Sequence, residues 1–432
     1  MAETETVQRA YEKALRAFGH RAEVTGVDIG YKYKDGRRGE QVVLRVHLRE
    51  KLAPGLVDPA QLLPAEIDGV PLDVIQGSYT PSGNGVLALA ARRHRRDPVQ
   101  PGLSISHHLG TAGTIGAIVY DRTDGAPCIL SNKHVLAEAA LAEAGDQILQ
   151  PGRIDGGRRD LDVIARLRRM HLGIKGDAAI AALTQGRQMR TALYGSDIQI
   201  QRTRRARLGD LAAKSGRTTG VTDGRVDGVG RFKVRYGFHD QWIEGFKLRT
   251  QDHANPGNLE LTRHGDSGAL WYDPVTQEGL GLHFAGEDDS APAAEFALAC
   301  HLDAVLDELL VSLTPVAPED FIGPGEVPVP DPADPPAPAA PPSPAGPTLA
   351  DLRRGAGAPE ASDPPAGPTL ADLLSAAGAN AETLRNLDRD DTCAAALREH
   401  GLSVVRRADG SLEIELDPVQ ARGKVRITFE PD

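Results

Sequence analysis

The distribution of proline divides this chain more firmly than any other feature of its sequence. Of the 31 prolines, 17 lie between Pro315 and Pro368. Proline has no amide hydrogen and a fixed φ, so such a run cannot build helices or sheet ladders and favours extended polyproline II. We therefore interpret residues 315–368 as a semi-rigid linker, which separates a long N-terminal part from a short C-terminal module at 369–432.

The linker region holds a repeat. The sequence PAGPTLADL occurs at 344–352 and again at 365–373. Two copies are too few for a solenoid, so the repeat is either a duplicated piece of linker or a docking motif with a leucine face.

The C-terminal module has the pattern of a small α+β unit. A helix-like segment at 381–400 precedes three strand-like runs, and Asp409-Gly410 between the first two is a hairpin signal. These runs lie at 402–407, 411–416 and 424–429.

Residues 1–78 predict a second α+β domain, with an amphipathic helix at 4–20 and strands at 24–34, 41–48 and 70–75. Between residues 79 and 314 the pattern changes to short apolar runs separated by glycine and proline turns, which favours an all-β barrel or sandwich. These runs lie at 114–120, 128–131, 161–167, 177–183, 214–221, 225–235, 268–272 and 279–284, and a predicted helix at 299–310 follows them. The fold class is therefore mainly β.

Charge and composition exclude some kinds of partner. The chain carries 49 basic and 60 acidic residues, a formal net charge of −11, and only 4% of its residues are aromatic. Nucleic-acid binding needs a basic surface or aromatic stacking platforms, so we expect no nucleic-acid partner. No run of 18 apolar residues occurs, so we expect no membrane-spanning helix and no membrane partner.

Cysteine and histidine usage predicts neither a disulfide framework nor a metal site. Cys128, Cys300 and Cys393 lie far apart and form no CxxC pair. The histidines, which include His107 and His108, show no ligand spacing such as HExxH, so we expect no metal and no cofactor. The first residues lack the basic and apolar regions of a secretory signal, and we expect a cytoplasmic protein.

The most specific motif is Gly265-Asp266-Ser267-Gly268. A serine nucleophile for acyl transfer sits on a tight turn, and flanking glycines permit the close approach and the unusual dihedral angles of such a turn. On this turn Ser267 would be the nucleophile, and the amides of Gly265 and Ser267 could form an oxyanion hole.

Two further motifs supply a base and an acid. His134 follows a short apolar run and opens an alanine-rich helical segment, where an imidazole can act as general base. Asp177 heads an apolar run, from which its carboxylate could orient the imidazole. Asp160 and Asp162 are rivals for this role, but the Ala-Ala-Ile-Ala run that follows Asp177 favours Asp177.

These motifs resemble the three catalytic boxes of trypsin-like serine proteases. The chain order His, Asp, Ser is that of chymotrypsin-type enzymes and differs from that of subtilisins and α/β-hydrolases. The segment 214–220 is similar to a glycine-rich strand box of bacterial members, and the segments 26–32, 44–51 and 67–75 resemble the domain that precedes the protease in narrow-leaf-type peptidases of plants and bacteria. The matching boxes are Asn132-Lys133-His134-Val135, Asp177-Ala178-Ala179-Ile180-Ala181 and Gly265-Asp266-Ser267-Gly268.

The resemblance covers about residues 20–310 and implies a double β-barrel with the active site in the cleft between the barrels. The chain departs from extracellular members because it has no cysteine pair near His134 or Ser267 and no evident activation sequence. How Asp266 is held therefore stays open. We interpret the basic run at 92–96 as an exposed interdomain loop.

The resemblance gives two conflicting signals for substrate preference. Leu261 lies six residues before Ser267, where family members often place the base of the primary pocket, and a leucine there would favour an apolar side chain. The acidic residues at 287–289 would instead favour lysine or arginine, unless they form a solvated loop. His264 and His283 are further candidates for substrate contact.

The sequence supports two hypotheses about function. The first is a cytoplasmic serine endopeptidase that hydrolyses protein or peptide substrates through an acyl-enzyme. The alternative is a catalytically weak binding or scaffold protein on a protease fold, because a fold does not guarantee an activity. In either case the repeats and the C-terminal module could recruit a protein partner.

Overall fold

The computed structural model describes most of the N-terminal part of the chain and three short strands near its end. The described residues are 2–34, 37–52, 57, 61–81, 90–138, 142–184, 186–237, 239–250, 260–286, 296–323, 402–406, 412–416 and 424–427. The chain divides into two compact units, Met1–Ala337 and Pro338–Asp432. Most of the predicted linker and the predicted helix at 381–400 lie outside the described residues.

The first large sheet has eight strands among the described residues, in the order β19-β8-β9-β12-β11-β10-β6-β7. Its interior is filled by small and β-branched side chains such as Ile105, Ile129, Ile164 and Ala181, which suit a pleated, buried surface. The strands are β6 (Ser104–His107), β7 (Gly113–Thr114), β8 (Ala117–Asp121), β9 (Pro127–Ser131), β10 (Gln147–Leu149), β11 (Val163–Gly173), β12 (Gly176–Leu183) and β19 (Val311–Ser312).

Part of the second sheet closes into a barrel. Within the described residues, six of its strands follow the order β13-β16-β17-β18-β15-β14, and β13 also pairs with β14, which completes the ring. Together the two sheets confirm the predicted mainly-β, double-barrel architecture. The six strands are β13 (Leu211–Gly216), β14 (Gly220–Tyr236), β15 (His239–Arg249), β16 (Leu270–Tyr272), β17 (Gly279–Gly286) and β18 (Phe296–His301).

One hydrophobic cluster draws on both sheets. Leu130 and Ile180, from β9 and β12, belong to the same buried cluster as Phe232, Leu282 and Phe284, from β14 and β17. Because this core is continuous, it fixes how residues on the first sheet face residues on the second.

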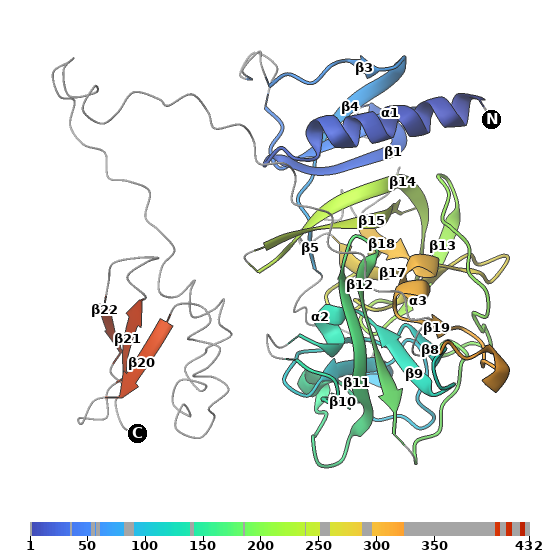
Figure 1. Cartoon of the computed structure of the whole chain (residues 1–432), viewed down its shortest axis with the longest axis vertical. Coiled ribbons are helices and arrows are strands. Elements are labelled where there is room, and N and C mark those ends of the chain that lie inside the picture. Colours follow the sequence, from blue (N-terminus) through green and yellow to red (C-terminus); the bar gives the residue numbers. More distant parts are fainter. Residues whose placement is uncertain are drawn as a thin grey trace. The chain divides into compact units, whose positions relative to one another are not determined.

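The predicted N-terminal helix and strands are confirmed as α1 (Ala2–Phe18), β1 (Val24–Lys34), β2 (Arg37–Leu48) and β4 (Val70–Gln76), with a short β3 (Glu66–Ile67). Side chains of α1, among them Tyr11 and Phe18, pack on Val27 and Leu44 of the strands. Since β1 pairs antiparallel with β14, this sheet continues directly into the second barrel (Figure 1).

A buried ion network fastens β1 and β2 to β14. Arg45 is 1% exposed, and its guanidinium contacts the carboxylates of Asp28 at 2.5 Å and Asp227 at 2.8 Å. Gly30 and Gly228 leave space for that guanidinium, because a Cβ at either position would lie 2.1 Å from it. Fully hydrogen-bonded buried charges of this kind hold two elements in one relative position.

Two sequence-based predictions are wrong in detail. Residues 299–301, predicted as the start of a helix, belong to β18, and α3 (Leu302–Glu308) begins only at Leu302. Their pairing with β15 and β17 overrides the helix propensity of alanine and leucine. The predicted single strand at 214–221 is instead split by a hairpin turn at 217–219, because β13 ends at Gly216 and β14 begins at Gly220.

The C-terminal unit contains the three predicted strands, β20 (Leu402–Arg406), β21 (Leu412–Leu416) and β22 (Lys424–Ile427). They form an antiparallel sheet in chain order. The hairpin between β20 and β21 is confirmed, whereas its turn residues Asp409 and Gly410 lie outside the described residues.

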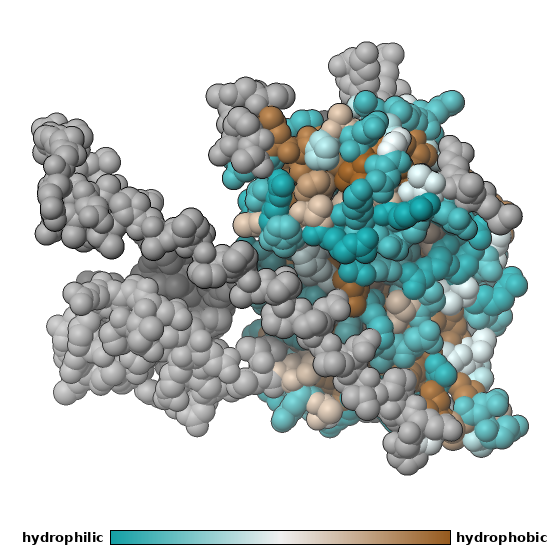
Figure 2. All heavy atoms as spheres, turned by 45° about the horizontal axis from the view of Figure 1, so that its top comes forward, coloured by the Kyte–Doolittle hydropathy of each residue, from teal (hydrophilic) through white to brown (hydrophobic). Residues whose placement is uncertain are grey.

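The visible surface of the N-terminal unit is mixed in character. Figure 2 shows hydrophobic residues scattered among hydrophilic ones on the face turned to the viewer. None of the helices in the described part of the chain combines the length and the apolar character that crossing a bilayer requires.

Candidate active site

Ser267 lies in a tight turn that leads into β16. The amide of Asp266 donates to the carbonyl of Arg263 at 2.9 Å, and that of Ala269 donates to the carbonyl of Asp266 at 2.9 Å. Gly265 and Gly268 have φ values of +94° and +90°, in the region that side-chain-bearing residues rarely adopt. The glycines of the motif therefore allow the turn, as the sequence predicted.

Thr114, in β7 of the first sheet, holds this turn through two hydrogen bonds. Its amide donates to the carbonyl of Ser267 and its hydroxyl donates to the carbonyl of Gly265, each at 2.8 Å. A Cβ on Gly268 would lie 2.1 Å from Oγ of Ser131 and 2.4 Å from the carbonyl oxygen of Thr114. The turn that carries Ser267 is therefore in close contact with residues of the first sheet.

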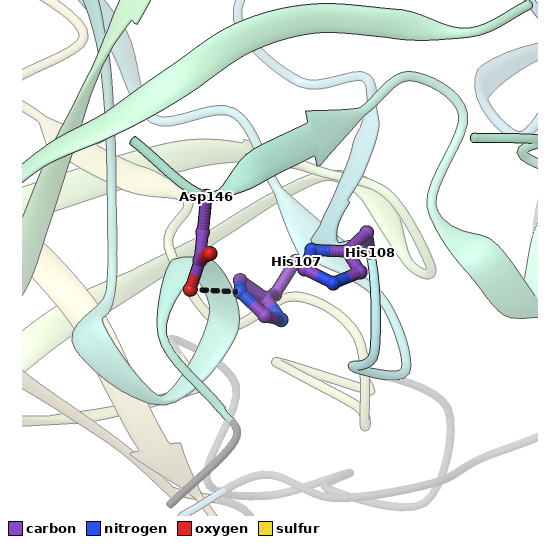
Figure 3. A group of neighbouring side chains, drawn as sticks. All are labelled: His107, His108 and Asp146. Carbon is purple, nitrogen blue, oxygen red and sulfur yellow. Dashed lines mark hydrogen bonds and ion pairs between the residues drawn. The ribbon is translucent and has the colours of Figure 1, made fainter. Parts of the chain in front are cut away.

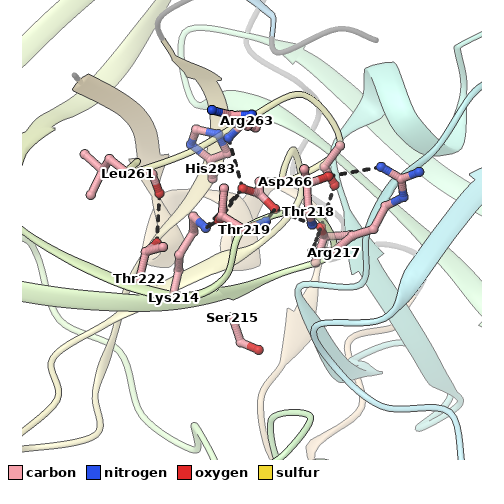
Figure 4. Close-up of polar contacts among 12 residues, drawn as sticks. Lys214, Ser215, Arg217, Thr218, Thr219, Thr222, Leu261, Arg263, Asp266 and His283 are labelled. Carbon is pink, nitrogen blue, oxygen red and sulfur yellow. Dashed lines mark hydrogen bonds and ion pairs between the residues drawn. The ribbon is translucent and has the colours of Figure 1, made fainter. Parts of the chain in front are cut away.

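Asp266 is held by an internal lysine. Nζ of Lys214 lies 3.2 Å from Oδ2 of Asp266, and both side chains are fully buried. The carboxylate also accepts hydrogen bonds from the amides of Thr218, Thr219 and Arg263 and from the hydroxyl of Thr219 (Figure 4). Burial alone would raise the pKa of Asp266, but the Lys214 charge and these donors hold it below its usual range.

His134 and Asp177 contact each other directly. His134 lies in the one-turn helix α2 (Lys133–Leu136) after β9, and Asp177 is the second residue of β12. Nδ1 of His134 hydrogen-bonds Oδ2 of Asp177, and the His134 amide donates to Oδ1 at 3.2 Å. A proton on Nδ1 faces the carboxylate, which leaves the Nε2 lone pair as the basic site.

Oδ2 of Asp177 receives a second donor from the other sheet. The hydroxyl of Tyr236, at the end of β14, donates to it at 2.6 Å. Burial alone would raise the pKa of Asp177, but the His134 charge and the hydrogen bonds from His134 and Tyr236 lower it. No motif in the sequence pointed to Tyr236, which lies 59 residues from Asp177.

The rival aspartates lie elsewhere. Asp160 is exposed and pairs with Arg158 at 2.7 Å, and Asp162 pairs with Arg95 at 2.6 Å. Of the three candidates, Asp177 is the one that contacts His134.

His134 and Ser267 line one pocket of about 410 Å³. Nε2 of His134 is buried and has no hydrogen-bond partner among the described residues. Leu172 and the turn between β14 and β15 form another wall. The lining residues are Thr111, Ala112, Lys133, His134, Val135, Ala137, Glu138, Leu172, Arg235, Tyr236, Gly237, His239 and Ser267.

The three residues predicted to contact substrate lie outside this lining. Leu261 is 1% exposed and packs in the core of the second barrel with Phe246 and Trp271. The carbonyl of His264, next to Gly265, accepts a hydrogen bond from Thr218 at 2.7 Å.

His283 lies beside the Ser267 turn. It is fully buried in β17, where its Nδ1 lies 3.2 Å from the carbonyl of Leu298, and burial lowers its pKa to about 3. Its carbonyl accepts the Gly268 amide at 2.9 Å. The acidic residues at 287–289 lie outside the described residues.

One histidine cluster outside the pocket has the residue types of a metal site. His107, His108 and Asp146 offer ligand atoms within 4.8 Å of one another (Figure 3). However, Nδ1 of His107 accepts the Leu109 amide at 3.2 Å, so the proton is on Nε2, which donates to Asp146 at 3.1 Å. A metal ion on Nε2 would place the ring proton on Nδ1, against the Leu109 amide, so the geometry favours a hydrogen-bonded cluster.

No protein-family model and no curated protein matches this chain. Solved structures match about half of it. A glutamic acid specific serine protease that uses a histidine triad in substrate binding is 20% identical, with a TM-score of 0.39, and the match covers 50% of this chain and 100% of that one. Thermobifida fusca Protease A is 14% identical, with a TM-score of 0.37, over 50% and 100% of the two chains.

The active form of the Rv3671c protease from M. tuberculosis is 16% identical, with a TM-score of 0.31, over 50% of this chain and 82% of that one. All three are proteases, the class that the motifs of this chain resemble.

Proposed function

We propose that the chain is a serine endopeptidase that hydrolyses peptide bonds in protein or peptide substrates. One observation supports this proposal most strongly. Ser267 and His134 line the same pocket, and Nδ1 of His134 is hydrogen-bonded to Oδ2 of Asp177. This is the arrangement in which an imidazole accepts a proton from a serine hydroxyl.

The residues act in sequence. Nε2 of His134 takes the proton of Ser267 as Oγ attacks the substrate carbonyl, and Asp177 stabilises the imidazolium that forms. The amides of Gly265 and Ser267 donate to the oxyanion, which lies next to the turn held by Thr114. His134 returns its proton to the leaving amine, and a water molecule then releases the acyl group by the same route.

The remaining assignments belong to the same proposal. The reaction uses no metal and no cofactor, and the enzyme acts in the cytoplasm. The C-terminal module and the repeats bring a protein substrate or regulator near the barrels by raising its local concentration.

Peptide hydrolysis by the full chain tests the proposal. We expect Ser267→Ala to lower kcat/KM by about 10⁴-fold or more, because removal of a triad member leaves only the contribution of binding and the oxyanion site. Ser196→Ala, a matched change whose hydroxyl bonds the Leu193 carbonyl, should leave kcat/KM unchanged. Equal rates in the wild type and in Ser267→Ala would favour the scaffold alternative.

A further inference from the structure

Thr218, in the hairpin turn between β13 and β14, holds the backbone on both sides of Gly265. Its hydroxyl donates to the carbonyl of His264 at 2.7 Å, and its amide donates to Oδ1 of Asp266 at 2.8 Å. Thr218 is 4% exposed, so water does not compete for these bonds. The two bonds reach the residue before Gly265 and the residue after it, and they therefore fix the conformation of the turn that leads to Ser267.

The bond to His264 determines which way the Gly265 amide points. The peptide bond between these two residues is trans. In a planar trans peptide the carbonyl and the following N–H point in opposite directions. Since the His264 carbonyl points at Thr218, the Gly265 N–H points away from Thr218, and no acceptor in the part of the chain that the structure describes takes its hydrogen bond. This amide can therefore donate to a substrate oxygen at the Ser267 turn.

Arg217 directs the hydroxyl proton of Thr218. Nη1 of Arg217 donates to Oγ1 of Thr218 at 3.0 Å, and the two side chains lie next to Asp266 (Figure 4). A guanidinium has only donors and a hydroxyl has one proton, so the Thr218 proton is left for the His264 carbonyl. A Cβ on Gly265 would lie 2.3 Å from Nη1 and 2.7 Å from Oγ1, so both groups approach this peptide only because residue 265 is glycine.

A carboxylate beside the first sheet holds Arg217. Asp155, in the short η3 (Arg153–Asp155) after β10, accepts Nε of Arg217 at 2.7 Å and Nη2 at 2.6 Å. Both side chains are 2% exposed, and such a two-point contact fixes the plane of the guanidinium. The hydroxyl of Ser104, the first residue of β6, donates to the same carboxylate. A continuous series of hydrogen bonds thus connects the first sheet to the Gly265 peptide.

We propose that Thr218 and Arg217 are positioning residues for the oxyanion site, because together they hold the Gly265 amide in the direction of the substrate oxygen. This inference rests on the proposed peptidase function. Neither side chain lines the Ser267 pocket, so both act through the Gly265 peptide. The substrate oxygen gains its negative charge only on the way to the transition state, so a fixed donor lowers the barrier and leaves substrate binding unchanged.

Removal of one hydroxyl tests the proposal in the full chain. Thr218→Val keeps the shape of the side chain, and we expect kcat for a peptide substrate to fall by about tenfold or more, towards the roughly 10²–10³-fold effect of losing an oxyanion donor. KM should stay within about twofold. Thr218→Ser keeps the hydroxyl and should restore kcat to within about threefold of the wild type.

Thr222→Val is the matched control. Its hydroxyl donates to the Leu261 carbonyl at 2.8 Å, so this variant loses the same kind of bond in the same hairpin (Figure 4). Leu261 lies outside the Ser267 pocket, and Thr222→Val should therefore keep the wild-type kcat.

A peptide trifluoromethyl ketone measures the oxyanion contact itself. Oγ of Ser267 adds to the ketone carbon, the hydroxyl proton passes to His134, and the ketone oxygen becomes the oxyanion. In Thr218→Val the inhibition constant should rise by the factor by which kcat/KM falls, because both report the same contact. A merely structural role would lower the fraction of folded enzyme and leave the inhibition constant of the folded fraction unchanged.

Arg217→Lys tests the second residue. A lysine keeps a positive charge for Asp155, but one ammonium group cannot take the places of Nε, Nη1 and Nη2 together. We expect kcat to fall roughly three- to tenfold in the wild-type background, the effect of about one net hydrogen bond. In Thr218→Val the same change should have little further effect, because the hydroxyl that Arg217 directs is absent. Equal effects in the two backgrounds would overturn the role of Arg217.

The wild type separates the possible failures. Wild-type kcat in Thr218→Val, a loss that lies in KM alone, or an equal loss in Thr222→Val would overturn the inference and leave the proposed function standing. If Thr218→Val does not fold, the same measurements on Thr218→Ala decide. A wild type that neither hydrolyses peptides nor binds the ketone would overturn the proposed function and this inference with it.

Discussion

The buried pair of Lys214 and Asp266 offers a sharp test of how the Ser267 turn is held. Both side chains are fully buried, and Lys214 is the charged partner among the groups that contact the carboxylate. In Lys214→Met the aspartate keeps its four hydrogen-bond donors from residues 218, 219 and 263, but its charge loses its counterion.

Removing one partner of a buried ion pair costs about 3–5 kcal/mol. The four remaining donors stabilise the Asp266 carboxylate, so we expect the lower end, a loss of about 3 kcal/mol in the free energy of unfolding. For a folded part of this size that corresponds to a fall in Tm of roughly 6–12 °C. Peptide hydrolysis should fall as well, because the turn carries Ser267 and Gly265.

Urea unfolding of the full chain, followed by tryptophan fluorescence, measures the effect, since Trp271 lies 5.7 Å from Nζ of Lys214. Lys214→Arg keeps the charge and controls for the loss of the cation. The double variant Lys214→Met, Asp266→Asn removes both charges and should be more stable than Lys214→Met alone. A loss below about 1 kcal/mol in Lys214→Met would show that Lys214 does not stabilise Asp266 as a buried counterion, because that is the value of an exposed pair.

Three further results are expected. Tyr236→Phe removes a hydrogen bond to the charged Asp177 and should lower kcat/KM roughly tenfold or more, whereas Tyr194→Phe should not. Gly268→Ala should abolish hydrolysis and destabilise the fold in urea, because the new Cβ would meet Ser131 at 2.1 Å; hydrolysis at the wild-type rate would contradict this. The lowered pKa of Asp266 contributes stability above about pH 4 that is lost as the pH falls further, so Asp266→Asn should flatten the unfolding free energy between pH 6 and pH 3.

The site residues that stand in a local sequence motif could be predicted from the sequence. The glycines beside Ser267 and the apolar strand after Asp177 are local signals, and the structure brings Asp177 to His134. Tyr236 and Thr114 could not be predicted, because each reaches the site from a strand that is distant in sequence. Lys214 belongs to the segment 214–220, which is similar to a strand motif of bacterial members. No local sequence pattern indicates that its ammonium group contacts the Asp266 carboxylate.

The same limit applies to the fold. Alternating apolar runs predicted most strands, since the alternation of apolar and polar residues in a strand can be recognised within a few neighbouring residues. The residues 299–301 were predicted as helix because their local propensity is helical, and only pairing with β15 and β17 makes them a strand. The pairing of β1 with β14 and of the short β5 (Thr80–Pro81) with β17 depends on contacts across about 200 residues, which no local pattern encodes.

The proposed function requires Ser267 to be a nucleophile that His134 activates. The most direct measurement is the intact mass and peptide map of the full chain after reaction with diisopropyl fluorophosphate. We expect one phosphoryl adduct, on Ser267, and strongly reduced labelling in His134→Ala. No adduct on the folded wild type, an adduct on another residue, or equal labelling in His134→Ala would contradict it.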